Sequence, residues 1–382
     1  MREYVLVLLV AAAVTFLLGS LARELATRIG AVAGVRDRDV HAIPIPYLGG
    51  IAMMGGLGAA FLVALRLPFL SRGESPLLHD AGFVLLGGLV ICLVGVVDDV
   101  IELDAVTKLA GEVVAASVVV VGNVQFLWLP MPGASTFDIE PSQSALLTVL
   151  VIVTTVNAVN FVDGLDGLAA GVIGIGAIAF FSFAYVVASV NRLDLGTPAA
   201  FLTIALVGVC LGILPHNFYP ARLFMGDSGA LLIGFILACS TVTLTGQYNP
   251  GAISQGLGGA TANLLPALLP LVLPFAILVV PFLDMVLAVV RRTRAGRSPF
   301  APDKQHLHHR LLEIGHSHRR AVLLMYLWAG LVAFGMVAVA LFTGWRSLAA
   351  LLVLVAFTAA LTFGHPRRLR RRAQGAAGSV GA

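Results

Sequence analysis

The chain has 382 residues, of which 59% are hydrophobic and only 12% are charged, and its mean hydropathy is +0.97. Charged residues make up about 25% of an ordinary soluble domain, so this composition excludes a soluble protein and indicates a polytopic membrane protein. Gly and Pro are scattered without a repeat period, which excludes a collagen-like or low-complexity chain.

Eleven apolar stretches follow one another along the chain, most of them near the roughly 20 residues that a helix needs to cross a bilayer. The first could be a cleaved signal peptide, but cleavage would export the arginines of the next loop. We therefore predict an all-α membrane protein with one transmembrane catalytic domain over 1–364 and a basic, disordered cytoplasmic tail at 365–382. The predicted spans are 4–20, 47–65, 81–97, 109–122, 143–160, 168–189, 197–215, 229–246, 264–288, 321–342 and 348–364.

Lysine and arginine are divided unequally between the two sets of loops that these spans define. If the first loop is cytoplasmic, 19 of the 24 basic residues lie on the cytoplasmic side and five on the other. Basic residues collect in cytoplasmic loops, so this division predicts an N-terminus outside and a C-terminus in the cytoplasm. Most histidines and carboxylates fall on the same side. We therefore expect an active site at the cytoplasmic face, whereas a transporter would hold ionisable residues near the bilayer midplane.

The third predicted span ends in two adjacent carboxylates, Asp98 and Asp99, and Lys108 follows before the fourth span. Adjacent carboxylates at the end of an apolar helix repel each other and need a cation or a shared proton. A magnesium ion that binds carboxylates and substrate phosphates would meet this need. A solvated helix end is the alternative, and the pair alone does not decide between the two.

A second polar segment joins the fifth and sixth predicted spans. Asn157 and Asn160 are one helical turn apart, and so are Asp163 and Asp166, so each pair shares one face if the segment is helical. The glycines between them allow the backbone to approach a ligand closely. Asp-Gly pairs also form turns, but two asparagines and two aspartates exceed what a turn requires. We predict a binding site here.

The loop after the seventh span leads directly into the eighth through Asp227 and Ser228, with a glycine on either side. Either side chain could cap the N-terminus of the eighth helix. A carboxylate beside the N–H groups of a helix start also suits a metal–phosphate complex. The residues leave cap and metal ligand open.

The longest cytoplasmic loop contains arginines, among them Arg294, and then three histidines followed by Arg310. Basic residues beside a span ordinarily determine only the topology. The histidines could bind a transition metal, but the loop has no cysteine and many arginines, so contacts with anions are favoured. The three histidines are His306, His308 and His309.

The first cytoplasmic loop contains His41, and the prolines and paired glycines of 44–50 bend the chain into the second span. By itself this loop is interpreted as structural. Together, the polar loops supply carboxylates for a divalent cation, basic residues for phosphates and apolar helices around them. The simplest chemistry that needs all three is phosphoryl transfer involving a lipid.

Four of these motifs, in this order, resemble a known family, the polyprenyl-phosphate N-acetylhexosamine-1-phosphate transferases. The motifs are Asp98-Asp99 with Lys108, then 157–171, 224–229 and 306–309, and the resemblance extends from about residue 19 to residue 342. The pattern at 305–310 is closer to the WecA-like branch, which uses UDP-GlcNAc, than to the MraY branch, which transfers phospho-MurNAc-pentapeptide and has consecutive histidines. Segments 290–297 and 315–320 are similar to actinobacterial enzymes that use decaprenyl phosphate.

The resemblance implies a magnesium-dependent reaction, with manganese as an alternative metal. UDP-GlcNAc and decaprenyl or undecaprenyl phosphate would give polyprenyl-diphospho-GlcNAc and UMP, the first membrane step of a cell-wall or surface polysaccharide. The implied metal ligands are Asp227, Asp98 and Asp99. The implied catalytic residues are Asp98, Asp99, Asp163, His306, His308 and His309, and the implied substrate-binding residues are His41, Lys108, Asn157, Asn160, Asp166, Arg294 and Arg310, with Asp166 at the uracil.

The resemblance further implies a multi-pass protein of the bacterial plasma membrane, surrounded by membrane lipids, with a homodimer as an expected assembly and no nucleic-acid partner. A phosphate monoester has a second pKa near 6, so the lipid phosphate is mostly dianionic at neutral pH and needs no strong base. This favours direct attack over a covalent aspartyl-phosphate, although the residues leave both open. The alternatives are an MraY-type enzyme and a lipid transporter without catalysis.

Overall fold

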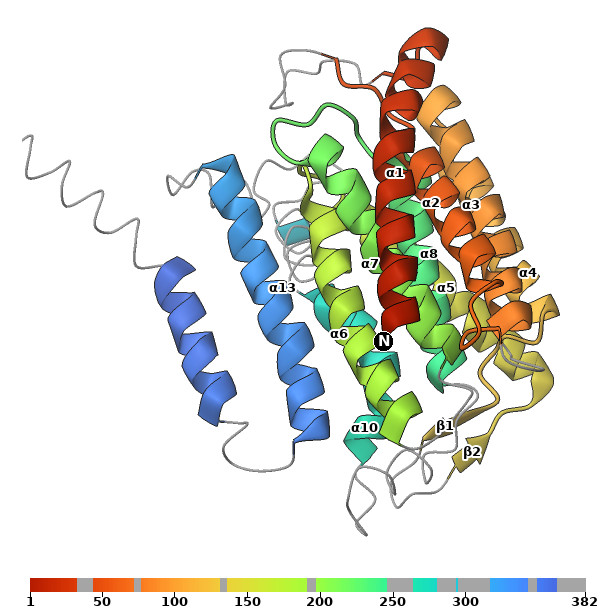
Figure 1. Ribbon diagram of the computed structural model, residues 1–382, viewed down its shortest axis with the longest axis vertical. Helices are drawn as coiled ribbons and strands as arrows, with labels where there is room; N and C mark the ends of the chain where they lie inside the picture. Colours follow the sequence, from red (N-terminus) through yellow and green to blue (C-terminus); the bar gives the residue numbers. More distant parts are fainter. Residues whose placement is uncertain are drawn as a thin grey trace, which may run out of the picture.

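The computed structural model describes residues 1–32, 44–71, 77–130, 136–190, 197–245, 264–279, 293–294, 317–342 and 349–362. These residues form a helical bundle with one short β-hairpin (Figure 1). The helices of the first half are α1 (Arg2–Ile29), α2 (Gly49–Ala64), the π-helical turn η1 (Leu77–Ala81), α3 (Gly82–Ile101), α4 (Ala105–Val121) and α5 (Pro141–Val162). Those of the second half are α6 (Leu168–Val190), α7 (Thr197–Asn217), α8 (Gly226–Thr245), α10 (Leu264–Ile277), α13 (His318–Leu341) and a last helix over Ala349–Thr362.

The hairpin precedes α5 and consists of β1 (Trp128–Pro130) and β2 (Thr136–Asp138), which pair in antiparallel fashion with Trp128 opposite Asp138. It lies at one end of the bundle (Figure 1). The polar helix ends, where α3 and α5 finish and α4 and α8 begin, lie at the other end. Consecutive helices in this part of the bundle therefore run in opposite directions (Figure 1).

Each of the eleven predicted spans overlaps a helix of the described chain, the ninth only over 264–277. Seven of these helices are long and apolar enough to cross a membrane: α1, α3 with the end of η1, α5, α6, α7, α8 and α13. The helix α2 and the apolar helices within 264–277 and 349–362 are shorter, and α4 has 17 residues. The class of a helical, multi-pass membrane protein is confirmed, while eleven crossings and the cytoplasmic side of the site stay predictions.

The helix α8 forms the centre of the bundle. Its span is buried along its whole length, and α3, α5 and α7 all pack against it. A helix that is apolar all round is stable only when it is surrounded. The peripheral α1 differs, because small residues at helical spacing, such as Ala11, Gly19 and Ala26, face the bundle and larger ones face outward.

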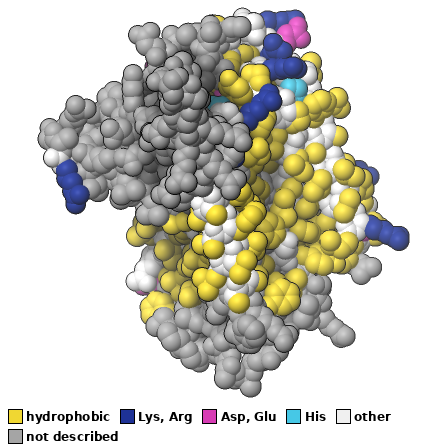
Figure 2. Space-filling model, turned by 90° about the vertical axis from the view of Figure 1, so that its left-hand side faces the viewer, with side chains coloured by type: hydrophobic (Ala, Val, Ile, Leu, Met, Phe, Trp, Pro, Cys, Tyr) yellow, Lys and Arg dark blue, Asp and Glu magenta, His cyan; other side chains and the backbone are white. Residues whose placement is uncertain are grey.

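Large apolar side chains cover the outside of the described bundle. Figure 2 shows hydrophobic side chains over most of the described surface in that view, with charged and histidine side chains towards its upper end and further basic side chains at its left and right edges. Leu17, Leu62 and Leu146 are each about two thirds exposed. An apolar belt of this extent would be an aggregation hazard in water, so its solvent is the hydrocarbon of a bilayer.

Two glycines bring the backbones of α2 and α3 against the start of α8. A Cβ atom on Gly50 would lie 2.3 Å from the carbonyl carbon of Ser228, and a Cβ atom on Gly95 would lie 2.4 Å from the Cα of Ser228. Small residues allow helices to approach this closely in membranes. The first turn of α8 is thus enclosed by two other helices, and this enclosure positions Asp227.

Candidate active site

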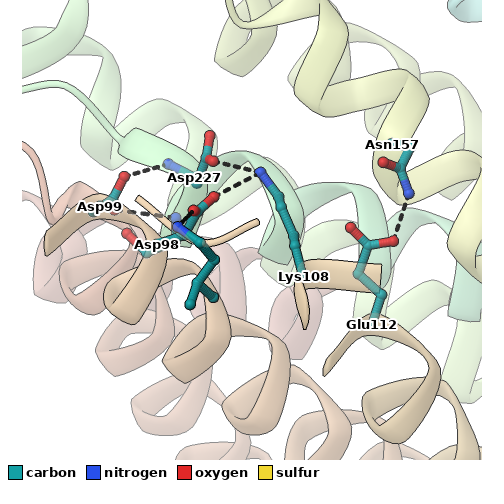
Figure 3. A network of polar contacts seen from close by, with 8 residues as sticks. Asp98, Asp99, Lys108, Glu112, Asn157 and Asp227 are labelled. Atoms are coloured by element: carbon teal, nitrogen blue, oxygen red, sulfur yellow. Dashed lines mark hydrogen bonds and ion pairs between the residues drawn. The ribbon is translucent and has the colours of Figure 1, made fainter. Parts of the chain in front are cut away.

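The start of α8 is capped by a side chain from another helix. The backbone N–H of Asp227 donates to Asp99 Oδ1 at 2.8 Å, and the N–H of Ser228 donates to Asp99 Oδ2 at 3.2 Å (Figure 3). These groups have no partner within the helix, and carboxylates are favourable at a helix N-terminus. The helix begins at Gly226, which has a φ of 68° and leaves no room for a Cβ beside Asp99.

This capping changes two sequence-based interpretations. The N–H groups that we expected to bind a metal–phosphate complex already bond to Asp99, and neither Asp227 nor Ser228 caps the helix with its own side chain, because the Ser228 hydroxyl donates to the carbonyl of Met225. Asp98 and Asp99 also point to different partners. Adjacent residues on a helix face directions about 100° apart, so Asp99 accepts from the backbone N–H groups of α8, whereas Asp98 pairs with Lys108 beside the Asp227 side chain.

The bend at 44–50 lies directly on the loop that leads into α8. The N–H of Phe224 donates to the carbonyl of Pro46 at 2.9 Å, Gly49 N–H donates to Phe224 O at 3.1 Å, and Gly50 N–H donates to Met225 O at 3.1 Å. This strand-like pairing holds the N-terminal loop and the Asp227 loop together. The bend at 44–50 is therefore part of the framework of the site.

Lys108 lies at the centre of the charged cluster. Its ammonium donates to Asp227 Oδ2 at 2.5 Å and pairs with Asp98 Oδ2 at 2.8 Å (Figure 3). Asn160 completes the group when its amide is assigned the orientation that satisfies both neighbours: its Oδ1 then accepts from Lys108 at 2.8 Å while its Nδ2 donates to Asp227 Oδ1 at 3.0 Å. Asp104 caps α4 through the N–H groups of the next turn and so starts the helix immediately before Lys108.

Oxygen atoms from three helices thus converge on one cationic group, the ammonium of Lys108. Two carboxylates, Asp98 and Asp227, and the amide of Asn160 are the hard oxygen donors that magnesium prefers. Within the described ranges no group of three His, Cys, Asp or Glu residues is arranged as a metal site. The donor set fits magnesium only if the amide oxygen or the substrate supplies ligands beside the two carboxylates.

The segment after α5 is not helical, so the condition under which Asp163 and Asp166 would share one helical face is not met. The helix ends at Val162, and α6 begins at Leu168. In this break, Asp166 Oδ2 accepts from the N–H of Ala221 at 2.9 Å. Asp166 is 5% exposed and ties this loop to the loop before α8.

Asp163 stays on the side of the charged cluster. Burial, and to a smaller extent the negative charges of Asp227 and Asp99, raise the pKa of Asp163 well above its usual value. This carboxyl therefore holds its proton to a higher pH than an exposed aspartate does, and its catalytic role stays a prediction.

A carboxylate that the sequence analysis did not single out lies beside the cluster. Glu112, on α4, is 2% exposed and accepts a hydrogen bond from Asn157 Nδ2 at 2.5 Å (Figure 3). The available signal was its position four residues after Lys108, inside an otherwise apolar predicted span. Asn157 and Asn160 share one face of α5 as predicted, and both face α4.

Comparison with known proteins places this cluster in a family. The model of glycosyl transferase family 4 matches residues 82–245. A decaprenyl-phosphate N-acetylglucosaminephosphotransferase of Mycobacterium tuberculosis is 47% identical over 340 residues, which cover 88% of this chain and 82% of that protein. The chain belongs to the polyprenyl-phosphate N-acetylhexosamine-1-phosphate transferase family.

More distant family members carry similar names. A probable undecaprenyl-phosphate N-acetylglucosaminyl 1-phosphate transferase of Bacillus subtilis is 30% identical over 94% of this chain and 90% of its own length. The undecaprenyl-phosphate alpha-N-acetylglucosaminyl 1-phosphate transferase of Escherichia coli is 29% identical over 82% of this chain and 77% of its own. These relatives agree with the WecA-like branch of the family rather than with the MraY branch.

The stretch that matches the family model contains every charged residue of the cluster, from Asp98 to Asp227. Arg294 is described and exposed. Five further residues that the family resemblance implied lie outside the described part of the chain, so their positions are not compared with the cluster. They are His41, His306, His308, His309 and Arg310.

Proposed function

We propose that the chain transfers GlcNAc-1-phosphate from UDP-GlcNAc to a polyprenyl phosphate, giving polyprenyl-diphospho-GlcNAc and UMP. The observation that carries this proposal is the 47% identity to a mycobacterial enzyme named for this transfer, over 82% of that enzyme's length. The same relative favours decaprenyl phosphate as the acceptor. We place the reaction at the cytoplasmic face of the plasma membrane, the side on which the loop charges of the sequence predict the cluster to lie.

Magnesium is the metal that we propose for this site. Asp227 and Asp98 would hold it with the amide oxygen of Asn160, and a magnesium ion, when bound, neutralises the oxygens of the donor diphosphate. The ammonium of Lys108 already lies between the two carboxylates. Its positive charge is therefore placed to attract the phosphates of both substrates into the cluster.

The transfer that we propose is a single displacement. The lipid phosphate is mostly dianionic at neutral pH because its second pKa is near 6, so its oxygen can attack the β-phosphorus without a strong base. We propose that Asp163, in its ionised form, takes up the remaining proton when the acceptor binds as a monoanion. The charge that develops on the departing UMP is met by the cationic groups of the cluster.

A coupled assay tests the proposed function. The purified protein in nanodiscs receives UDP-GlcNAc with magnesium, and UMP release is followed with and without decaprenyl phosphate. We expect release only when both substrates are present. Release without the lipid indicates a hydrolase, and no release with either lipid, decaprenyl or undecaprenyl phosphate, contradicts the proposal in favour of a lipid-handling protein.

The donor is tested in the same assay by comparing UDP-GlcNAc, UDP-GalNAc and UDP-MurNAc-pentapeptide. We expect the first to give most of the lipid product, and a preference for the last would place the chain in the MraY branch. The predicted homodimer is tested by the mass of the protein in the same nanodiscs.

A further inference from the structure

Two pairs of polar side chains join α4 to α5 like the rungs of a ladder. Nearest the end of the bundle, Lys108 bonds to Asn160 at 2.8 Å. One turn deeper, Glu112 accepts from Asn157 at 2.5 Å. The spacing of four residues on α4 and three on α5 places both pairs on the facing sides of the two helices. We call the pair of Glu112 and Asn157 the deep rung.

A buried carboxylate in an apolar helix is costly unless it has a partner, and in membrane proteins such residues mark functional sites. Glu112 is 2% exposed and lies in the middle of the apolar residues of α4. A hydrophobic residue at this place would hold α4 to α5 without this cost. The carboxylate therefore has a use beyond packing, and its bond to Asn157 indicates where that use lies.

The two rungs share their helices with the charged cluster. Asn160 follows Asn157 by less than one turn and bonds to Asp227, while Lys108 precedes Glu112 by about one turn and bonds to Asp98 and Asp227. A rotation of α5 that breaks the deep rung would also turn the Asn160 amide away from Asp227. The geometry of the deep rung thus sets the direction of Asn160.

We propose that Glu112 is a positioning residue, which through its hydrogen bond to Asn157 fixes the rotation of α5 and so aims Asn160 and Lys108 at Asp227. This proposal rests on the proposed function. It gives Asn157 a different role from the predicted one, because the amide that we expected to bind the nucleotide is held by Glu112. Asn157 is exposed, so a direct contact with the substrate is the competing explanation.

An exchange of the two groups distinguishes these explanations. Asn157→Asp alone sets two carboxylates against each other, and we expect kcat to fall about tenfold to a hundredfold, the cost of a buried polar group without a partner. Glu112→Gln alone keeps an oxygen that accepts from Asn157, and we expect at most a few-fold loss. The double variant restores the bond in reverse, with the amide introduced at position 112 as donor, and should recover at least tenfold over Asn157→Asp.

The measurements are kcat, the KM for UDP-GlcNAc, the magnesium concentration at half-maximal rate and the thermal midpoint of each variant. Positioning predicts that Asn157→Asp lowers kcat and raises the magnesium requirement, and that the double variant reverses both. A purely structural rung lowers the midpoint and leaves the kcat of the folded protein unchanged. A direct contact raises the KM without recovery in the double variant, and either result overturns the proposal.

Glu140→Gln is the matched control, since Glu140 is an exposed carboxylate before α5 whose side chain forms no capping bond. It should leave all four quantities unchanged. If the wild-type protein releases no UMP, the proposed function fails. In that case the thermal midpoints of the wild type, the two single variants and the double variant still test the deep rung. If the effects of the two substitutions on the midpoint simply add, positions 112 and 157 are not coupled and the deep rung is disproved.

Discussion

The two helix junctions that form the charged cluster are built in different ways. At the junction of α3 with α8, the Asp99 side chain bonds to two backbone N–H groups, and glycines bring backbone against backbone. At the junction of α4 with α5, the bonds run between side chains alone. Backbone contacts at close range resist small movements more strongly than pairs of side chains do. Asp227 is therefore presented by a rigid junction, and Lys108 by an adjustable one.

The largest expected effect is at the residue where the two junctions meet. Asp227→Asn removes a charge that bonds to Lys108 and is proposed to bind magnesium, and we expect UMP release to fall on the order of 10³-fold. Expression and the thermal midpoint should stay close to the wild-type values, because the capping bonds of α8 use the backbone. Normal turnover in this variant would remove Asp227 from the metal site.

The rigidity of the α3–α8 junction is tested by adding one methyl group. Gly95→Ala forces a Cβ to within 2.4 Å of the Ser228 backbone, and overpacking of this kind costs about 1–3 kcal/mol. We expect a lower thermal midpoint together with lower activity. Gly58→Ala, on α2 with open space around the added atom, serves as the control. Equal thermal midpoints for the two variants would show that the α3–α8 junction adjusts to the added methyl group and is not rigid.

A smaller effect separates the two adjacent aspartates. Asp99→Asn weakens the cap of α8, and loss of a cap costs about 1 kcal/mol, so we expect a lower thermal midpoint. Asp98→Asn leaves the cap intact and should reduce turnover at an almost unchanged midpoint. Thermal unfolding and UMP release of both variants are measured side by side. If Asp98→Asn has the lower thermal midpoint, the assignment of Asp99 as the cap and of Asp98 as the metal ligand is contradicted.

The sequence was sufficient to locate the helices, because hydropathy is a local property and each predicted span overlaps a helix of the described chain. The hairpin of β1 and β2 was not predicted, and its strands have only three residues each. The helix ends were less accurate. We expected the eighth span to begin at 229, and α8 begins three residues earlier at Gly226, since the bond to Asp99 extends the helix. The residues around 226 do not reveal that a side chain of α3 bonds to the start of α8, because that partner lies far away in the sequence.

The same limit explains the outcome at the site. Asp98, Lys108 and Asp227 were predicted from their types and spacing, and the structure brings them together. The separate tasks of Asp98 and Asp99 depend on the rotation of α3, and the use of Asp166 depends on the backbone of Ala221, 55 residues away. Glu112 was overlooked because one carboxylate in an apolar run does not change the prediction of a span.

The enclosed start of α8 also has a consequence for how the chain is made. Residues 46–50 and 95–99 are synthesised long before Asp227, yet their carbonyl, N–H and carboxylate groups bond to residues 224–228. Until α8 is inserted, Asp98 and Lys108 lack Asp227, and the glycines of α2 and α3 lack the Ser228 backbone that they contact in the finished bundle. The charged cluster is therefore complete only when α8 enters the bundle, so we expect a ribosome-bound chain that ends before α8 to be inactive.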